Sequence, residues 1–230
     1  MTASTSTKGA APSADALRAH VLASLEARET HEAPYAYAVL RDMLPNDAIE
    51  AIYQVPADVP DVAGESGRRE IHNKSRSYFD VETQRDQPVA AALCEAFQAP
   101  ETVSAIERAF GTDLEGTSLR VEYALDTDGF WLEPHTDLGV KRFTLLIYLS
   151  DGEGHEGLGT DIYDGDATPV ARSPFGPGTA MAFVPGDDTY HGFEKRPIQG
   201  VRRSLIVNYV TPEWRAREQL AYPETPVTAR

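Results

Sequence analysis

The sequence predicts a mainly β domain with flanking helices, an α+β arrangement in which the helices come first and the β core follows. Six short β-rich runs lie after residue 116, and turns of Gly, Pro and Asp separate them. Short strands at such regular spacing are typical of a sandwich or a barrel. The residues before this region show helical patterns instead. With 230 residues, the chain is within reach of one domain with a sizeable core.

The first 116 residues are expected to supply mainly helical support. Residues 1–12 are small and polar and predict a disordered tail. Ser13 suits the N-cap of a helix to about Glu29, with apolar residues on one face at Leu17, Val21, Leu22 and Leu25. The further elements expected are a strand at 35–44, a helix opened by Pro45, a loop at 56–67, a strand at 75–83, and helices near 87–98 and 100–110, the last ending at Gly111.

The β core is expected over residues 117–210. Its six runs are TSLRVEYAL, KRFTLLIYLS, GTDIYD, TPVARSP, GTAMAFVPG and VRRSLIVNYV. A last helix is expected to begin at Thr211-Pro212, since Pro is favoured in a first helical turn. The sequence therefore predicts a single domain over 13–230, made of the support segment 13–116, the core 117–210, and a C-terminal helix and tail at 211–230.

Charge and composition exclude several classes of partner. The chain has 36 acidic residues against 21 Lys plus Arg, a net charge of −15. A surface this acidic repels phosphate groups, so neither nucleic acid nor a membrane is expected as a partner. One cysteine, Cys94, cannot form an internal disulfide. The sequence shows no signal-peptide pattern and no run of roughly 18 apolar residues, so a cytoplasmic location is expected.

A possible metal site lies at the start of the second strong strand pattern. His135 and Asp137 are two residues apart, and side chains two apart on a strand point the same way. His191 follows 54 residues after Asp137, beside another strand pattern. Two histidines and one carboxylate on one face, with open positions left, suit non-haem Fe(II) oxygenases. An H-x-D pair also occurs in ordinary turns, and zinc hydrolases use the same ligand types.

An arginine near the last strand adds to this pattern. Arg202 lies eleven residues after His191, where an apolar strand begins. A buried guanidinium is costly unless it meets an anion, and a carboxylate matches its planar fork. Arg203 competes with it, because strand alternation directs one of the two arginines out of the core.

Residues from about Leu119 to Val210 resemble the 2-oxoglutarate- and Fe(II)-dependent oxygenases, and most closely their prolyl-4-hydroxylase-like branch. The segments that carry the resemblance are YALDTDGFWLEPHTD, FTLLIYLSDGEGHEGLGT and GTAMAFVPGDDTYHGFEKRPIQGVRRSL. They are similar to the branch's Tyr…Gly…His-x-Asp opening, its Tyr-Leu-Asn/Ser strand end, and its Phe…His…Gly-x-Arg/Lys segment. The resemblance implies a double-stranded β-helix (jelly-roll, cupin-like) core preceded by N-terminal helices.

The resemblance also implies roles for individual residues. His135, Asp137 and His191 would bind Fe(II), and the Gly-x-Arg register favours Arg202 over Arg203 as the partner of the distal carboxylate of 2-oxoglutarate. Three more residues would contact this cosubstrate: Tyr148, Tyr123 and Ser204. The sequence departs from the family pattern at Tyr123, which precedes His135 by 12 residues, a longer gap than usual.

The activity so implied is a dioxygenase reaction with Fe(II), 2-oxoglutarate and O2, in which a C–H bond of a small molecule or amino-acid-like substrate is hydroxylated and succinate and CO2 are released. Retention of Asp137 favours hydroxylation over halogenation, because halogenating relatives carry Gly or Ala there. Two alternatives stay open: a peptidyl or protein prolyl hydroxylase, and a catalytically silent jelly-roll module that binds a metabolite.

Substrate contacts are predicted from a basic run and an aromatic pair. The segment GRREIHNKSRSYF precedes the core, where relatives carry substrate-covering segments. Lys74 or Arg76 within it would meet an anionic substrate, and the alternative is a solvated basic loop. Trp131 and Phe130 would line the mouth of the pocket, or else pack as ordinary core residues.

Overall fold

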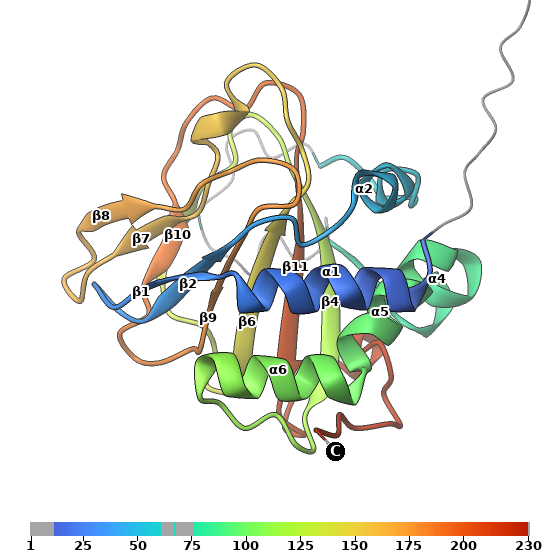
Figure 1. The fold of residues 1–230 in the computed structure, drawn as a ribbon. Coiled ribbons are helices and arrows are strands. Elements are labelled where there is room, and N and C mark those ends of the chain that lie inside the picture. The colour runs from blue at the N-terminus through green and yellow to red at the C-terminus, as the bar shows by residue number, and fades with distance from the viewer. Residues whose placement is uncertain (1–11, 61–66, 68–75, 230) are drawn as a thin grey trace, which may run out of the picture.

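The computed structural model describes residues 12–60, 67 and 76–229, and it confirms the jelly-roll fold (Figure 1). The strands, in chain order, are β1 (Glu29–His31), β2 (Tyr37–Leu40), β3 (Ser77–Tyr78), β4 (Ser118–Asp126), β5 (Leu132–His135), β6 (Lys141–Tyr148), β7 (Asp161–Tyr163), β8 (Pro169–Arg172), β9 (Ala180–Phe183), β10 (His191–Phe193) and β11 (Arg202–Val210). They form a seven-stranded sheet in the order β1-β2-β9-β6-β11-β4-β3 and a four-stranded sheet in the order β5-β10-β7-β8.

The helices cover the outer face of the larger sheet, as Figure 1 shows for α1, α5 and α6. The helical segments are α1 (Ala14–Glu26), α2 (Asn46–Ile52), α4 (Val81–Asp86), α5 (Pro88–Gln98), α6 (Pro100–Phe110) and the 3-10 turns η2 (His155–Gly157) and η3 (Arg217–Gln219). The predicted caps are present: the Ser13 side chain accepts a hydrogen bond from the Ala16 amide, and Gly111 ends α6 at φ 65°.

Strand alternation separates a core from a polar interior. On β4, alternate residues pack under the helices: Leu119, Val121, Tyr123 and Leu125. The residues between them line cavities on the opposite face: Arg120, Glu122, Ala124 and Asp126. The same division holds on β11, where Leu205 and Val207 join the core while Arg202 and Ser204 face the interior. The face of the larger sheet that borders the interior between the two sheets therefore carries the polar and charged side chains.

Three element predictions are wrong. The predicted strand at 75–83 is only the two-residue β3, because Asp80 accepts a hydrogen bond from the Thr83 amide and starts α4. The run expected to start at His135 is two strands, so His135 ends β5 and Asp137 lies in the turn before β6. The helix expected at Thr211-Pro212 is absent from the described residues, where one turn and η3 are found instead. This segment pairs with β4, since the Ala221 amide donates to the Leu119 carbonyl.

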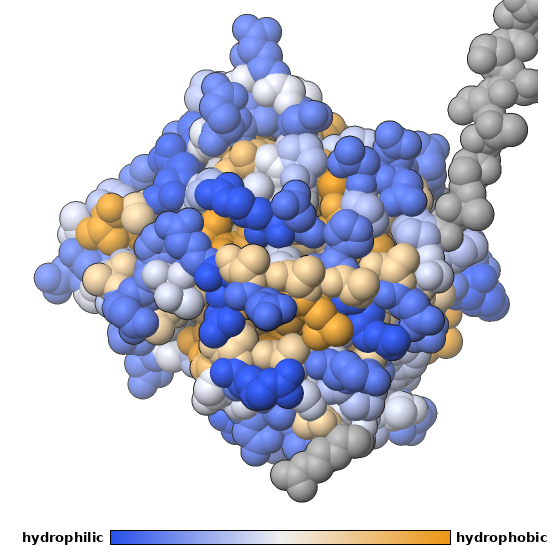
Figure 2. Space-filling model, in the orientation of Figure 1, coloured by the Kyte–Doolittle hydropathy of each residue, from blue (hydrophilic) through white to orange (hydrophobic). Residues whose placement is uncertain are grey.

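Residues before 117 contribute more than helices. β1 and β2 extend the larger sheet through β9, and β3 extends it through β4. The face seen in Figure 2 is mainly hydrophilic, with hydrophobic atoms gathered near its middle over α1. No helix within the described part of the chain has the length and apolar character needed to cross a bilayer.

Candidate metal centre

Three side chains predicted as ligands meet in the interior. His135 at the end of β5 pairs directly with His191 at the start of β10, and their ring centroids lie 4.4 Å apart. Asp137 follows in the turn after β5. One ligand atom from each of the three residues lies within 4.8 Å of the other two. Two imidazoles and a carboxylate at this separation can share one transition-metal ion.

Backbone carbonyls fix the orientation of both imidazoles. Nδ1 of His135 lies 2.9 Å from the Glu133 carbonyl oxygen, and Nδ1 of His191 lies 3.0 Å from the Thr189 carbonyl oxygen. A carbonyl can only accept, so each Nδ1 carries the proton and each Nε2 carries the lone pair for a metal. Burial, with a smaller contribution from His135, lowers the pKa of His191 to about 3, which keeps this ring neutral near pH 7.

Asp137 is held by two residues of β6. Its side chain is 1 % exposed; Oδ1 accepts from Lys141 Nζ at 2.5 Å and Oδ2 accepts from Thr144 Oγ1 at 2.6 Å. The Asn208 amide donates in turn to Thr144 Oγ1 at 2.9 Å. These contacts set the plane of the carboxylate in a buried site.

A ladder of alternating charges lies along the interior face of β4. Arg202 Nη1 lies 2.6 Å from Asp126 Oδ2, and Arg76 Nη1 lies 2.9 Å from the other oxygen of that carboxylate. Arg76 also approaches Glu122 at 3.5 Å, and Arg120 Nη2 lies 2.6 Å from Glu122. Among the residues that the structure describes, this ladder joins three guanidiniums to two carboxylates.

The comparisons with known proteins rest on structure alone. No family model matches the sequence, and no curated protein matches it. A prolyl-4-hydroxylase from Pseudomonas putida superposes with a TM-score of 0.52 and 18% sequence identity, over 85% of this chain and 98% of that chain. A prolyl 4-hydroxylase from Phytophthora capsici superposes with a TM-score of 0.56 and 14% sequence identity, over 90% of this chain and 68% of that chain. A Trichoplax adhaerens prolyl hydroxylase, solved with a hypoxia inducible factor peptide, superposes with a TM-score of 0.53 and 14% sequence identity, over 86% of this chain and 90% of that chain. The chain has the prolyl 4-hydroxylase fold.

Within the prolyl 4-hydroxylase fold, the predicted cosubstrate residues divide by strand face. Arg202 and Ser204 line an inner cavity between the two sheets, which also contains all three candidate ligands. Tyr148 is buried beside it, and its hydroxyl lies 2.8 Å from Thr160 Oγ1 and 2.6 Å from Ser173 Oγ. Thr160 lines the inner cavity. The Thr160 side chain therefore lies between the Tyr148 hydroxyl and the inner cavity.

Tyr123 and Arg203 lie on the helix-covered face instead. Tyr123 packs in the core cluster beside Phe79, and its hydroxyl accepts from Arg203 Nη1 at 2.7 Å. The structure thus directs Arg202 inward and Arg203 outward, as the register predicts. It does not bring Tyr123 to the inner cavity, because this residue has the outward parity of β4. Glu122 and Asp126, which the sequence reasoning missed, occupy the inward positions beside it.

The residues predicted to contact the substrate differ in where the structure places them. Arg76 does line the inner cavity, but its buried guanidinium is engaged by Asp126 and Glu122. Trp131 is partly buried against Gly67 and lines neither the inner cavity nor the pocket beside it. Lys74 falls outside the described residues.

Lys141 belongs to the site, although strand alternation alone would place its side chain on the opposite face of β6. Alternation from Thr144, Leu146 and Tyr148 directs Arg142 inward and Lys141 outward. The pairing of β6 with β11 shifts at this point, because Tyr209 pairs with Phe143 whereas Val210 pairs with Lys141. Arg142 is the extra residue of this bulge and is exposed, whereas Lys141 is buried and 3 % exposed. The bulge therefore directs Lys141 to Asp137.

Loss of the Thr144 hydroxyl should weaken metal binding. Thr144→Val keeps the side-chain volume but removes the hydrogen bond to Asp137 Oδ2 and the acceptor for Asn208. We expect the affinity for Fe(II) or Co(II) to fall about 10- to 100-fold, as is usual when a residue that orients a metal ligand is lost. Competition with a chromophoric chelator measures this. Thr144→Ser retains the hydroxyl and should bind metal like the wild type; equal affinities for all three proteins would contradict the orienting role.

Proposed function

We propose that this chain is an Fe(II)- and 2-oxoglutarate-dependent dioxygenase. It hydroxylates an unactivated C–H bond of a small molecule or amino-acid-like substrate, with release of succinate and CO2. The observation that carries this proposal is the approach of His135, Asp137 and His191 to within 4.8 Å inside a prolyl 4-hydroxylase fold. The donor set fits Fe(II), since two neutral imidazoles and one carboxylate leave positions for the keto acid and dioxygen.

The role proposed for each residue follows from its charge and its place in the interior. His135, Asp137 and His191 hold Fe(II), which when bound supplies the activation of dioxygen and the oxidative decarboxylation of the keto acid. Arg202, with Ser204 on the same face of the strand, binds the distal carboxylate of 2-oxoglutarate through its planar guanidinium. Apolar residues of the inner cavity limit the access of water: Leu146, Phe193 and Ile206.

Residues 13–230 are proposed to act as one oxygenase domain. Asp137 retains the carboxylate that leaves no room for a halide, which favours hydroxylation. A peptidyl prolyl hydroxylase is the second candidate, and the fold shared with prolyl hydroxylases favours it. Zinc would suit the same three ligands, but the fold shared with prolyl hydroxylases favours Fe(II).

An anaerobic titration tests the proposal. Fe(II)-loaded protein mixed with 2-oxoglutarate should develop a weak visible charge-transfer band, and exposure to air should then yield succinate. Protein loaded with Zn(II) is the matched control and should give neither signal. A band without succinate would indicate a silent binding module. Absence of both signals in fully Fe(II)-loaded protein would overturn the proposed function.

A further inference from the structure

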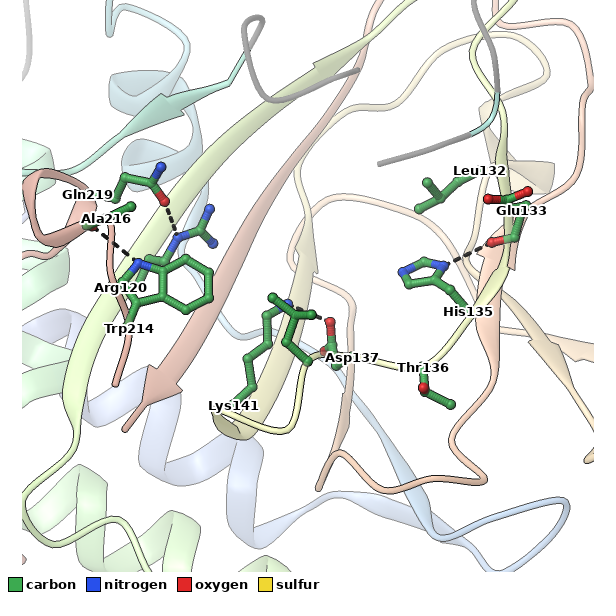
Figure 3. A pocket seen from close by; sticks show the side chains of 11 residues that line it. Arg120, Leu132, Glu133, His135, Thr136, Asp137, Lys141, Trp214, Ala216 and Gln219 are labelled. Atoms are coloured by element: carbon green, nitrogen blue, oxygen red, sulfur yellow. Dashed lines mark hydrogen bonds and ion pairs between the residues drawn. The ribbon is translucent and has the colours of Figure 1, made fainter. Parts of the chain in front are cut away.

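A second cavity opens beside the candidate metal centre. This side pocket has a volume of about 330 Å³, and His135 and Asp137 line both it and the inner cavity. Figure 3 shows Trp214 and Arg120 on one side of the side pocket, and His135 with Leu132 on the other. A molecule in the side pocket would therefore lie against the candidate metal ligands, in a space that suits a small organic compound.

Two contacts hold the Trp214 ring at this wall. Its indole nitrogen donates a hydrogen bond to the Ala216 carbonyl oxygen at 3.2 Å, and Cζ of Arg120 lies over the ring, 5.0 Å from its centroid. Arg120 is buried, and its guanidinium donates to side chains of three residues: Gln219, Asn208 and Glu122. The ring is therefore oriented before any ligand binds, and with its polar atom already bonded it offers the side pocket an aromatic surface.

The side pocket continues outward past the same ring. A neighbouring groove of about 440 Å³ shares Leu138, Trp214 and Ala216 with it and adds Val140. Leu138 directly follows the candidate ligand Asp137 in the sequence and is 63 % exposed. Covering this side chain with an apolar ligand is favourable, because it removes apolar surface from water. Apolar contact thus extends from the metal ligands along the indole ring to Leu138.

We propose that the primary substrate carries an aromatic ring, and that this ring stacks on Trp214. The inference rests on the proposed function, because it takes the molecule in the side pocket to be the compound that is hydroxylated. The indole ring and the two candidate ligands His135 and Asp137 line one pocket, so a molecule held on Trp214 lies next to the metal centre.

The contacts of Trp214 favour an aromatic ring over other partners. An indole face attracts either a cation or another aromatic ring. Arg120 already supplies a cation to this ring, and its positive charge disfavours a second one close by. An aliphatic body would gain only from burial, whereas a planar ring also gains from offset stacking. Trp214 is therefore proposed to determine specificity for aromatic compounds.

The test compares uncharged aromatic amides with their saturated counterparts. The probe pairs are benzamide with cyclohexanecarboxamide, and 2-naphthamide with decahydro-2-naphthamide, which match in charge and differ in planarity. Zn(II)-loaded protein is titrated calorimetrically with each probe. For at least one pair, the ratio of aromatic to saturated affinity should be about 2- to 10-fold higher in the wild type than in Trp214→Leu, the usual gain from aromatic pairing. Trp214→Phe should retain the wild-type ratio.

Trp131→Phe is the matched control. It alters the other of the two tryptophans, which lines neither the side pocket nor the neighbouring groove, so the ratio should stay unchanged. Co(II) in place of Zn(II) reports the location, because this paramagnetic ion should broaden the NMR signals of a bound aromatic probe beyond their width with Zn(II). Equal ratios in the wild type and Trp214→Leu would overturn the proposal, and so would the absence of binding or of broadening by Co(II).

Failure of the proposed function gives a different result. The titration with Fe(II) and 2-oxoglutarate needs no aromatic probe. A protein that forms the charge-transfer band and succinate, but whose probe affinities do not depend on Trp214, would overturn this inference alone. A protein that binds an aromatic probe beside Co(II), but forms neither the band nor succinate, would overturn the assignment of the bound molecule as a substrate together with the proposed function.

Discussion

Replacement of Asp137 by Asn is expected to abolish succinate formation and also to destabilise the fold. The amide is a poor ligand for Fe(II), and it removes the carboxylate charge that lies 2.5 Å from the buried Lys141 ammonium. Removal of one partner from a buried ion pair costs about 3 kcal/mol or more. Denaturant unfolding of metal-free protein measures this loss, and a coupled succinate assay of Fe(II)-loaded protein measures activity.

A double variant separates the two effects. Asp137→Asn/Lys141→Met removes both charges, so the free energy of unfolding should return toward the wild-type value while activity stays lost. The two single variants and the double variant form a cycle whose coupling term reports the ion pair. If the Asp137→Asn protein were as stable as the wild type, the ion pair between Asp137 and Lys141 would not contribute to the stability of the fold.

Replacement of Arg202 by Met is expected to raise the apparent dissociation constant for 2-oxoglutarate about 30-fold or more. Loss of one partner of a buried, hydrogen-bonded charge pair costs about 2 kcal/mol or more in binding. The inward position of Arg202 carries this prediction. Asp126 keeps Arg76 as a counter-ion in this variant, so the fold should survive. Titration of the charge-transfer band with 2-oxoglutarate gives the constant.

The adjacent arginine provides the control. Arg203→Met removes a guanidinium that faces Tyr123 and the Tyr53 ring on the other side of the sheet. Its effect on 2-oxoglutarate binding should be small. If Arg203→Met weakened binding and Arg202→Met did not, the assignment of the cosubstrate to the interior face of β11 would have to be abandoned.

The sequence predicted correctly the elements that are marked by a capping residue or by an apolar pattern of their own. Ser13 caps α1, Gly111 ends α6, and β4 and β11 follow their apolar patterns closely. The C-terminal helix was predicted wrongly, because Pro212 is a valid helix start but the backbone after it pairs with β4. Such long-range pairing leaves no local sequence signal.

The site was predictable to the extent that spacing and alternation determine it. His135, Asp137 and His191 do meet, although Asp137 belongs to a turn and not to the strand of His135. Alternation assigned Arg202 correctly and Lys141 incorrectly, because the bulge at Arg142 inserts one residue and reverses the faces beyond it. No residue type in that stretch marks the bulge, so sequence reasoning had no signal from which to find it.

The direct pairing of His135 with His191 has an evolutionary consequence. The two imidazoles are neighbours because β5 and β10 are adjacent in one sheet, whatever the course of the more than fifty residues between them. The exposed turn between β7 and β8 belongs to that intervening stretch. It can lengthen, shorten or change composition while the pair of imidazoles stays in place. The separation of the two histidines in the sequence can therefore change without moving the two imidazoles apart.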